Sequence, residues 1–540
     1  MALPWGNWSI YRLLLIAGAS VTAVMILLVP AYLLVRMGGA WSEAFETLSK
    51  PRTLTILGNT IKLAMAVTLS TTAIAVPIAW LTTQTDLPGR RVWAILAALP
   101  LVVPSYIYAY LMVSVLSPKG LLQQLLEPFG VNRLDPIYGF PGAFLVLTFV
   151  SYPYILLTVR AALVRMDPAL LEAARSLGLS PRQAFWRVTL PYLRPPILAG
   201  GLLVALYVLR DFGAVTMLQY STFTRIIYNR YLSFKLDAAA AMAFVLVLLT
   251  AVFLFLEWRV RGKSQYARAS IGVARKNAPF ALGKWKLPAL FFVALIVFWA
   301  LIVPVGGLSY WLWRGLNQDW AVHKTGSATT TVTYLTNLIE PAWNSISVAT
   351  MGAILAVLLA LPITILVVRR PGRLTIFFER LTYASFALPG IVVALAYVFF
   401  GINYAQSLYQ TLPIMLAAYV VLFIPQAVGA ERASFIQLSP NLEEAGRSLG
   451  KRPFAILGRI TLPLVRPGIL SGAILVFLTI MKELPATLIL SPSGFNTLAA
   501  QVWSNISEAL FARAAAPTLL LILLSSIPLA WMTLRGRETI

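Results

Sequence analysis

The sequence contains one loop twice, as MDPALLEAARSLGLSPRQAFWRVTLPYLRP at Met166–Pro195 and as LSPNLEEAGRSLGKRPFAILGRITLPLVRP at Leu438–Pro467. The two copies, called here the first and second repeat loops, align without a gap at a constant offset of 272 residues. The same offset places Arg210-Asp211 on Lys482-Glu483. A repeat of this extent indicates that whole halves of the chain are duplicated. The architecture is therefore predicted to consist of two equivalent halves.

Each repeat loop is predicted to form a short helix, a turn and a second helix. In the first loop, Asp167-Pro168 is typical of a helix start, and Gly178 permits the left-handed turn that ends the helix. Ser180-Pro181 starts the second helix, and we expect Pro191 to break it before the next apolar stretch. The second loop repeats the pattern with Ser439-Pro440, Gly450 and Pro463.

The composition around the loops is that of a polytopic membrane protein. Of the 540 residues 59% are hydrophobic and only 11% are charged, against roughly 25% charged in soluble domains. A membrane-spanning helix needs about 20 apolar residues, and twelve stretches qualify. They are Leu13–Val35, Leu54–Leu81, Val92–Leu116, Tyr138–Val159, Ile197–Leu218, Ala238–Trp258, Leu287–Tyr310, Trp343–Val368, Phe377–Phe400, Leu412–Ala430, Ile469–Leu490 and Ala514–Leu534.

The basic residues orient these spans. The net charge is +24, and with the N-terminus placed in the cytoplasm 29 Lys and Arg residues fall inside and 11 outside. This asymmetry predicts a multi-pass membrane protein with both termini in the cytoplasm. Because the charge is spread over many short loops, membrane lipid is the expected neighbour and nucleic acid is not a predicted partner.

The expected organisation is therefore all-α, with about 12 transmembrane helices in two six-helix halves. The halves are residues 1–258 and 287–540, and the basic segment 259–286 joins them as a cytoplasmic linker. Because six spans is an even number, both halves enter the membrane in the same direction, and they form a parallel repeat.

The residue inventory excludes most catalytic chemistry. There is no Cys and the single His is His323, so disulfides, thiolate metal sites and histidine clusters are excluded. Gly262-Lys263-Ser264 is no phosphate-binding loop, because position 257 is Glu rather than Gly. We expect no catalytic residue, no metal site and no cofactor bound by this chain, and any ATP is used by partner subunits.

The two repeat loops resemble the EAA motif of binding-protein-dependent ABC importer permeases. Glu172-Ala173-Ala174, Gly178, Val188 and Leu190-Pro191 match it in the first copy, with Val in place of Ile. In the second copy the matching residues are Glu444-Ala445-Gly446, Gly450, Ile460 and Leu462-Pro463, with Gly in place of the second Ala. The resemblance implies the type I importer permease fold and assigns to these residues the docking of two cytosolic ABC ATPase subunits.

The resemblance also suggests a substrate. A fused permease with one such loop in each half is similar to the ferric-iron importers, whose partner is a periplasmic or lipid-anchored substrate-binding protein. Arg210-Asp211-Phe212-Gly213-Ala214 and Lys482-Glu483-Leu484-Pro485-Ala486-Thr487 resemble that subgroup's fifth-span signatures. Importers of thiamine or a polyamine by the same mechanism are the alternatives, and a duplicated 12-span secondary transporter is a further one that would not need the loops.

The charges of the fifth spans have two interpretations. A charge near the bilayer centre costs at least about 2.5 kcal/mol unless it faces water or a partner. In one interpretation Arg210 pairs with Glu483 and Lys482 with Asp211, so that the pairs lock or gate the two halves. In the other, Asp211 and Glu483 are oxygen ligands for a hard cation on the translocation path.

Five tyrosines near span ends are further candidates. We interpret Tyr106, Tyr108, Tyr110, Tyr152 and Tyr154 as residues of an interfacial aromatic belt, with substrate contact as the alternative.

Overall fold

The computed structural model describes residues 5–39, 41–261, 280–317 and 331–535. Within these ranges every regular element is a helix, and the single β-type pairing is an isolated bridge between Thr85 and Phe280. The predicted all-α fold is confirmed. Most of the predicted linker (262–279) and the segment 318–330, which includes His323, lie outside the described residues.

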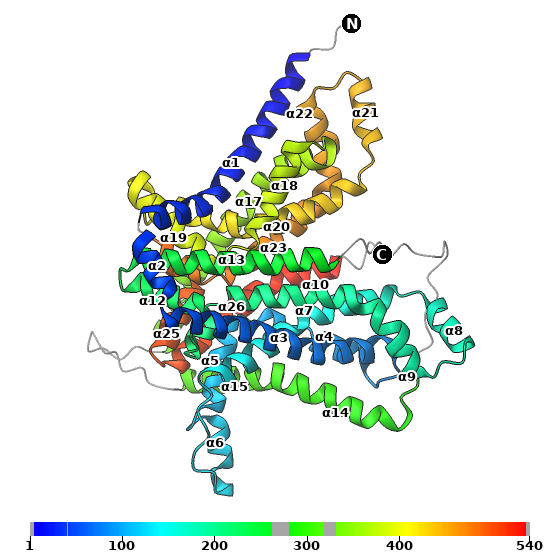
Figure 1. Ribbon diagram of the computed structural model, residues 1–540, viewed down its shortest axis with the longest axis vertical. Helices are drawn as coiled ribbons and strands as arrows, with labels where there is room; N and C mark the ends of the chain where they lie inside the picture. The colour runs from blue at the N-terminus through cyan, green and yellow to red at the C-terminus, as the bar shows by residue number, and fades with distance from the viewer. Residues whose placement is uncertain (1–4, 40, 262–279, 318–330, 536–540) are drawn as a thin grey trace. The chain divides into compact units, whose positions relative to one another are not determined.

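The helices form two compact units. Unit 1 contains Met1–Thr47, Arg230–Phe244 and Gly315–Ile540, and unit 2 contains Leu48–Asn229 and Val245–Arg314. Three long helices pack together at the centre of each. They are α3 (Pro51–Gln84), α7 (Phe140–Arg165) and α10 (Leu190–Arg210) in unit 2, and α17 (Ile339–Arg369), α20 (Leu412–Gln437) and α23 (Leu462–Met481) in unit 1. Because these triplets are equivalent in the two sequence halves, the duplication is visible in the packing (Figure 1).

Shorter helices complete the units. Unit 2 adds α4 (Arg90–Leu96), η1 (Leu99–Val102), α5 (Ser105–Leu116), α6 (Leu121–Leu126), η2 (Glu127–Phe129), α8 (Pro168–Ser176), α9 (Pro181–Ala184), η3 (Phe185–Thr189), α11 (Gly213–Met217), η4 (Gly283–Trp285), α14 (Lys286–Val297) and η5 (Phe298–Ile302). Unit 1 adds α1 (Trp5–Gly39), α16 (Thr331–Thr336), α18 (Arg373–Ser385), α19 (Gly390–Tyr404), η6 (Gln406–Leu408), α21 (Pro440–Ser448), α22 (Pro453–Ile456), η7 (Leu457–Thr461), α24 (Pro485–Leu490), α25 (Leu498–Ser507) and α26 (Phe511–Arg535). Residues of both units belong to α2 (Trp41–Ser49), α12 (Phe223–Leu232), α13 (Leu236–Arg261) and α15 (Val303–Leu316).

The first helix of each sequence half packs among helices of the other half. In unit 1, α1 packs against α17, α18 and α19, where a Cβ at Gly18 would lie only 2.9 Å from Pro362 and Tyr397 donates a hydrogen bond to the Met25 carbonyl (3.2 Å). In unit 2, α14 packs against α3 and α4, and Tyr108 donates to the Trp299 carbonyl (2.9 Å). Each compact unit therefore contains helices from both of the sequence halves predicted from the repeat. The predicted boundaries of those halves, at 258 and 287, stay a prediction.

The described residues contain the helices of a multi-pass membrane protein. Ten of their helices are long and apolar enough to cross a bilayer, and two further pairs of bent helices bring the number to as many as 12. Helices suit this environment because all their backbone groups are bonded internally. Buried hydroxyls follow the same rule, as when Thr60 and Thr82 donate to the carbonyls of Ile56 and Ile78, one turn earlier.

Two spans predicted to be continuous are broken. The predicted span Val92–Leu116 consists of α4 with η1 and then α5, with a bend of 101°, and Phe377–Phe400 consists of α18 and α19, with a bend of 110°. The break falls at Pro104 in the first and at Pro389 in the second, both with extended backbone. Proline lacks the N–H of a helical hydrogen bond and restricts the preceding residue, so it weakens the helix at these positions. Because α7 and α17 continue past Pro153 and Pro362, proline alone does not decide the breaks.

The fifth predicted span of each half is also broken. The prediction of continuous helices over Ile197–Leu218 and Ile469–Leu490 was wrong, because α10 ends at Arg210 and α23 ends at Met481, and the short helices α11 and α24 follow. The charged residues expected inside continuous spans therefore lie at two helix breaks.

Pro191 and Pro463 do not end the second helices of the repeat loops, contrary to prediction. The helices continue into α10 and α23 through π-helical turns, η3 and η7. A π turn bonds residue i to i+5 and widens the helix locally, so it accommodates a residue that lacks an N–H and whose ring crowds the previous turn.

The end of the linker is fixed to unit 2. Phe280 donates its N–H to the Gln84 carbonyl (2.7 Å) and accepts from the N–H of Asp86 (3.1 Å). The Asp86 carboxylate accepts from the N–H of Leu282 (2.9 Å) and pairs with the Lys286 ammonium (2.7 Å). These five residues are called the linker anchor.

Candidate functional site

The first repeat loop forms the predicted helix, turn and helix. The Asp167 carboxylate caps α8 by accepting from the N–H of Ala169 (3.0 Å). Gly178 has φ +79°, the left-handed conformation that favours glycine. Ser180 and Gln183 then exchange hydrogen bonds, each side chain accepting from the other's N–H (3.4 and 2.9 Å), as in a capping box at the start of α9.

The second repeat loop has the same construction in unit 1. Ser439 caps α21 through the N–H of Asn441 (3.4 Å), and Gly450 has φ +73°. Figure 1 shows α21 and α22 beside the N-terminal end of α1, where the rings of Tyr11 and Phe454 meet edge to face at 5.3 Å.

The motif residues divide into an exposed part and a buried part. Glu172 and Ala173 are exposed on α8, whereas Ala174 is buried. In the second copy Glu444 and Ala445 are exposed on α21 and Gly446 is buried. The acid and the first alanine are therefore open to a partner, and the third residue contributes to the packing of the loop itself.

The two departures from the motif compensate each other in volume. A Cβ at Gly446 would lie 2.8 Å from Cδ1 of Ile460, which is closer than such atoms approach. The equivalent residues of the first copy are Ala174 and Val188. The second copy thus combines the larger Ile460 with the smaller Gly446, and the first copy combines the smaller Val188 with the larger Ala174. Close packing requires such a balance of volumes.

Both loops present large apolar side chains to solvent. Leu177 and Leu449, next to the turn glycines, are 82% and 78% exposed, and neither lies in a candidate span. Exposed apolar patches rimmed by polar residues mark interaction sites.

At the break after α10, Asp211 is buried and accepts a hydrogen bond from the first turn of the following helix. Its carboxylate accepts from the N–H of Val215 (3.2 Å) and from the Ser105 side chain at the start of α5. Its carbonyl accepts from the Thr224 hydroxyl (2.6 Å). The carboxylate therefore joins two helix breaks of unit 2.

Glu483 has the equivalent place in unit 1. Its carboxylate accepts from the N–H of Ala486 (3.2 Å) at the start of α24, and its oxygen lies 2.6 Å from where a Cβ of Gly390 would be. Gly390 starts α19, as Ser105 starts α5. The shorter side chain of Asp211 thus lies beside Ser105, and the longer side chain of Glu483 lies beside Gly390.

The predicted cross-half pairs join residues of different units. Arg210 and Asp211 belong to unit 2, and Lys482 and Glu483 belong to unit 1. Lock, gate and substrate contact stay predictions. The structure adds that each acid accepts a backbone hydrogen bond from the first turn of the short helix after the break.

The belt interpretation of the tyrosines is wrong for four of them. Tyr106, Tyr108, Tyr110 and Tyr152 are at most 2% exposed and lie in the interior of unit 2. A belt residue faces the membrane interface, whereas these side chains are part of the packing around α5 and α7.

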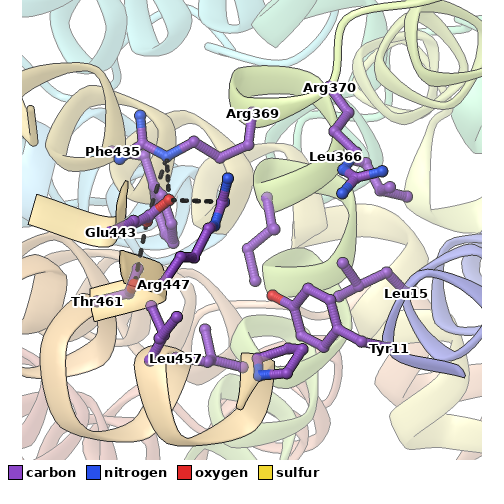
Figure 2. A pocket seen from close by; sticks show the side chains of 13 residues that line it. Tyr11, Leu15, Leu366, Arg369, Arg370, Phe435, Glu443, Arg447, Leu457 and Thr461 are labelled. Atoms are coloured by element: carbon purple, nitrogen blue, oxygen red, sulfur yellow. Dashed lines mark hydrogen bonds and ion pairs between the residues drawn. The ribbon is translucent and has the colours of Figure 1, made fainter. Parts of the chain in front are cut away.

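Figure 2 shows a pocket in unit 1 between α1, the end of α17 and the second repeat loop. Glu443 of α21 pairs with Arg369 (3.2 Å), accepts from the Thr461 hydroxyl (3.0 Å) and lies 4.0 Å from the Arg447 guanidinium. Arg369 also donates to the Leu438 carbonyl (3.1 Å), so it holds both ends of the α20–α21 connection.

Sequence reasoning missed this ionic cluster. The signal was available in the repeat, because Glu443 occupies the position of Leu171 in the first copy. A charged residue at one copy of an otherwise apolar position indicates a feature specific to that half.

Comparison with known proteins gives the class. The family model for the binding-protein-dependent transport system inner membrane component matches residues 86–260 and again residues 350–538. The chain belongs to this family, and it is an ABC importer permease that contains the family's unit twice.

Individual relatives are also transport-system permeases. The chain is 34% identical over 490 residues to the Fe(3+)-transport system permease protein FbpB 2 of Haemophilus influenzae, covering 90% of this chain and 91% of the relative. It is 23% identical over 468 residues to the ferric transport system permease protein FbpB of Actinobacillus pleuropneumoniae, with 84% and 67% covered. The sulfate transport system permease protein CysT of Salmonella typhimurium is 28% identical over 239 residues, 43% of this chain and 85% of that protein.

Proposed function

We propose that this chain is the translocation pore of an ATP-driven importer of ferric iron. It receives the ion from a substrate-binding protein outside the bacterial cytoplasmic membrane. Two cytosolic ATPase subunits, one on each repeat loop, supply the energy, and this chain hydrolyses no ATP. Both termini lie in the cytoplasm.

The observation that carries the docking proposal is the pair of repeat loops. Each loop is a capped helix, a left-handed glycine turn and a second helix, with the motif acid exposed and a leucine beside the turn at least 78% exposed. A rigid, apolar-tipped protrusion is suited to insertion into a partner's cleft. Two such protrusions in one chain fit two copies of the same partner.

The ferric substrate is supported by the relative that matches across nine-tenths of this chain. Asp211 and Glu483 offer hard oxygen ligands of the kind a small, highly charged cation prefers.

Transport by the reconstituted complex tests the substrate. Proteoliposomes containing this chain, its ATPase and its binding protein are expected to accumulate radioactive ferric iron only with ATP inside the compartment that carries the ATPase. Thiamine, putrescine and sulfate are tested in parallel. Uptake of one of these without iron would contradict the ferric assignment while retaining the importer, and uptake without the ATPase would indicate a secondary transporter.

A further inference from the structure

The pocket of Figure 2 combines a cavity with an excess of positive charge. Its volume is about 40 Å³, more than the roughly 10–15 Å³ that one water molecule needs. Six of its lining residues have polar side chains: Tyr11, Arg369, Arg370, Glu443, Arg447 and Thr461. Three guanidinium groups and one carboxylate line the cavity, a formal excess of two positive charges.

The charges are unequally engaged. Glu443 is buried and lies 3.2 Å from Arg369, which is itself only 13% exposed, so this pair is largely neutral. Arg447 is 4.0 Å from the same carboxylate and 45% exposed. Arg370 is exposed at the end of α17. Arg370 therefore places a positive charge at the solvent side of the pocket, where an anion would enter.

The repeat loop itself does not require these charges. Aligning α3 with α17 on Pro77-Ile78 and Pro362-Ile363 places Gln84 and Thr85 at the positions of Arg369 and Arg370. With Leu171 in place of Glu443, the first copy lacks two of the three guanidinium groups and the carboxylate, and it still forms the same helix, turn and helix. The arginine pocket is an addition to the second half.

Its position relative to the spans indicates the ligand. Tyr11 lies at the start of the candidate span Ile10–Gly39, and Arg369 is the last residue of the span Tyr334–Arg369. The pocket therefore lies at the ends of two candidate spans, where apolar sequence gives way to charged residues. Its remaining wall is apolar and includes Leu15, Leu366 and Ile456.

We propose that this pocket binds a phosphate group, carried by an anionic phospholipid or present as a free phosphate. The planar donor fork of arginine matches phosphate oxygens, the tyrosine adds a hydroxyl, and the apolar wall fits the glycerol region of a lipid. The bound group would connect α1, α17 and the second repeat loop. The first repeat loop would have no equivalent ligand, so the two loops would respond differently to the lipid.

Thermal unfolding of the purified full chain in a neutral detergent tests the proposal. The additions are phosphatidylglycerol, phosphatidylcholine as the uncharged lipid, inorganic phosphate, and chloride at the same ionic strength. The test variant is Arg370→Gln. The matched control is Arg373→Gln, an equal loss of charge at an exposed residue three positions along that does not line the pocket.

We expect phosphatidylglycerol to raise the unfolding temperature of the wild type and of Arg373→Gln by several degrees, and Arg370→Gln to lose at least half of that shift. Arg370→Lys, which keeps the charge but not the fork, is expected to be intermediate. A shift with inorganic phosphate and none with the lipid would assign the site to a soluble phosphate. An unchanged response in Arg370→Gln, an equal loss in Arg373→Gln, or no response to either phosphate source would overturn the proposal. No transport assay enters the test, so its failure leaves the proposed function untouched.

Discussion

At the scale of single residues, the two copies of the repeat show how one structure accommodates different side chains. Ala174 with Val188 and Gly446 with Ile460 are two solutions to one packing problem, as are Ser105 with Asp211 and Gly390 with Glu483. In each case, where one residue of the pair is smaller in the second copy, the other residue of that pair is larger.

The first prediction concerns the pair in the second repeat loop. Gly446→Ala places a methyl group 2.8 Å from Ile460, and overpacking of this kind costs about 1–3 kcal/mol. Adding Ile460→Val recreates the first copy's pair and is expected to recover most of that loss, measured by denaturant unfolding. Gly458→Ala, with open space around its Cβ, is the control and should change little. Equal destabilisation in the single and double variants would contradict the compensation.

The second prediction separates the lock from substrate contact. Glu483→Gln and Asp211→Asn remove the charge but keep an acceptor oxygen, so they retain the hydrogen bonds from the N–H groups of Ala486 and Val215. If Arg210 pairs with Glu483, Arg210→Gln and Glu483→Gln each strand a buried charge at a cost of about 3–5 kcal/mol, and the double variant is milder than their sum. The ATPase activity of the complex in the absence of substrate measures this loss of locking.

If the acids contact the cation instead, iron uptake is lost, ATPase coupling is retained and the double variant rescues nothing. Strictly additive effects would rule out the lock.

At the scale of secondary-structure elements, the repeat loops depend on their glycine turns. Gly450 adopts φ +73° and donates its N–H to the Arg447 carbonyl (2.9 Å), and Gly178 is in the same conformation. Each turn sets the direction of the helix that follows it.

The third prediction is that Gly450→Pro or Gly178→Pro abolishes ATPase coupling and leaves membrane insertion intact. Proline is restricted to φ near −65° and cannot donate, so the turn cannot form. Gly450→Ala should be milder, costing about 1–2 kcal/mol for the left-handed conformation. Co-purification of the ATPase and the ATPase rate are measured, with Gly458→Ala as the control in the same loop. Normal coupling in both proline variants would refute the docking role.

The fourth prediction concerns the linker anchor. The Lys286 ammonium, together with the N–H of Leu282, holds the pKa of the Asp86 carboxyl below its ordinary value. A lowered pKa in the folded state means that the bond stabilises the anchor above the ordinary pKa of about 4 and is lost as the pH falls below it. We therefore expect no change of the anchor between pH 5 and pH 8.

Hydrogen exchange at the Leu282 amide measures this, because its acceptor is the Asp86 carboxylate. Asp86→Asn should weaken protection at pH 7, and the difference from the wild type should shrink only below about pH 4. Glu127→Gln, at an exposed acid elsewhere in unit 2, is the control. Undiminished protection in Asp86→Asn would show that the backbone bonds of Phe280 hold the anchor alone.

At the scale of the whole molecule, one polypeptide contains both copies of the family's unit, at residues 86–260 and 350–538. The first helix of each half packs with the helices of the other half's core, as α1 does with α17 and α14 with α3. Separating the halves would expose these helix faces, so we expect each half to need the other to bury them.

The fifth prediction is the composition of the assembled transporter. With two docking loops in one chain, we expect one permease chain for every two ATPase subunits. Native mass spectrometry of the purified complex measures the ratio. Two permease chains with two ATPases would mean that one loop of each chain is idle, which would contradict the docking proposal.

The sequence by itself determined the class of the protein. Apolar stretches of about 20 residues admit little besides membrane helices, and a gapless repeat with capping residues and turn glycines at equivalent positions fixes both loops locally. These features depend on neighbours within a few residues, so they could be predicted without a fold.

Tertiary structure alone decided the rest. The breaks at Pro104 and Pro389, the π turns that carry helices through Pro191 and Pro463, and the exchange of α1 and α14 all depend on what packs beside each helix. The arginine pocket likewise brings together side chains from residues 11, 369 and 443. Their proximity follows from helix packing, which acts over distances along the chain that no local pattern records.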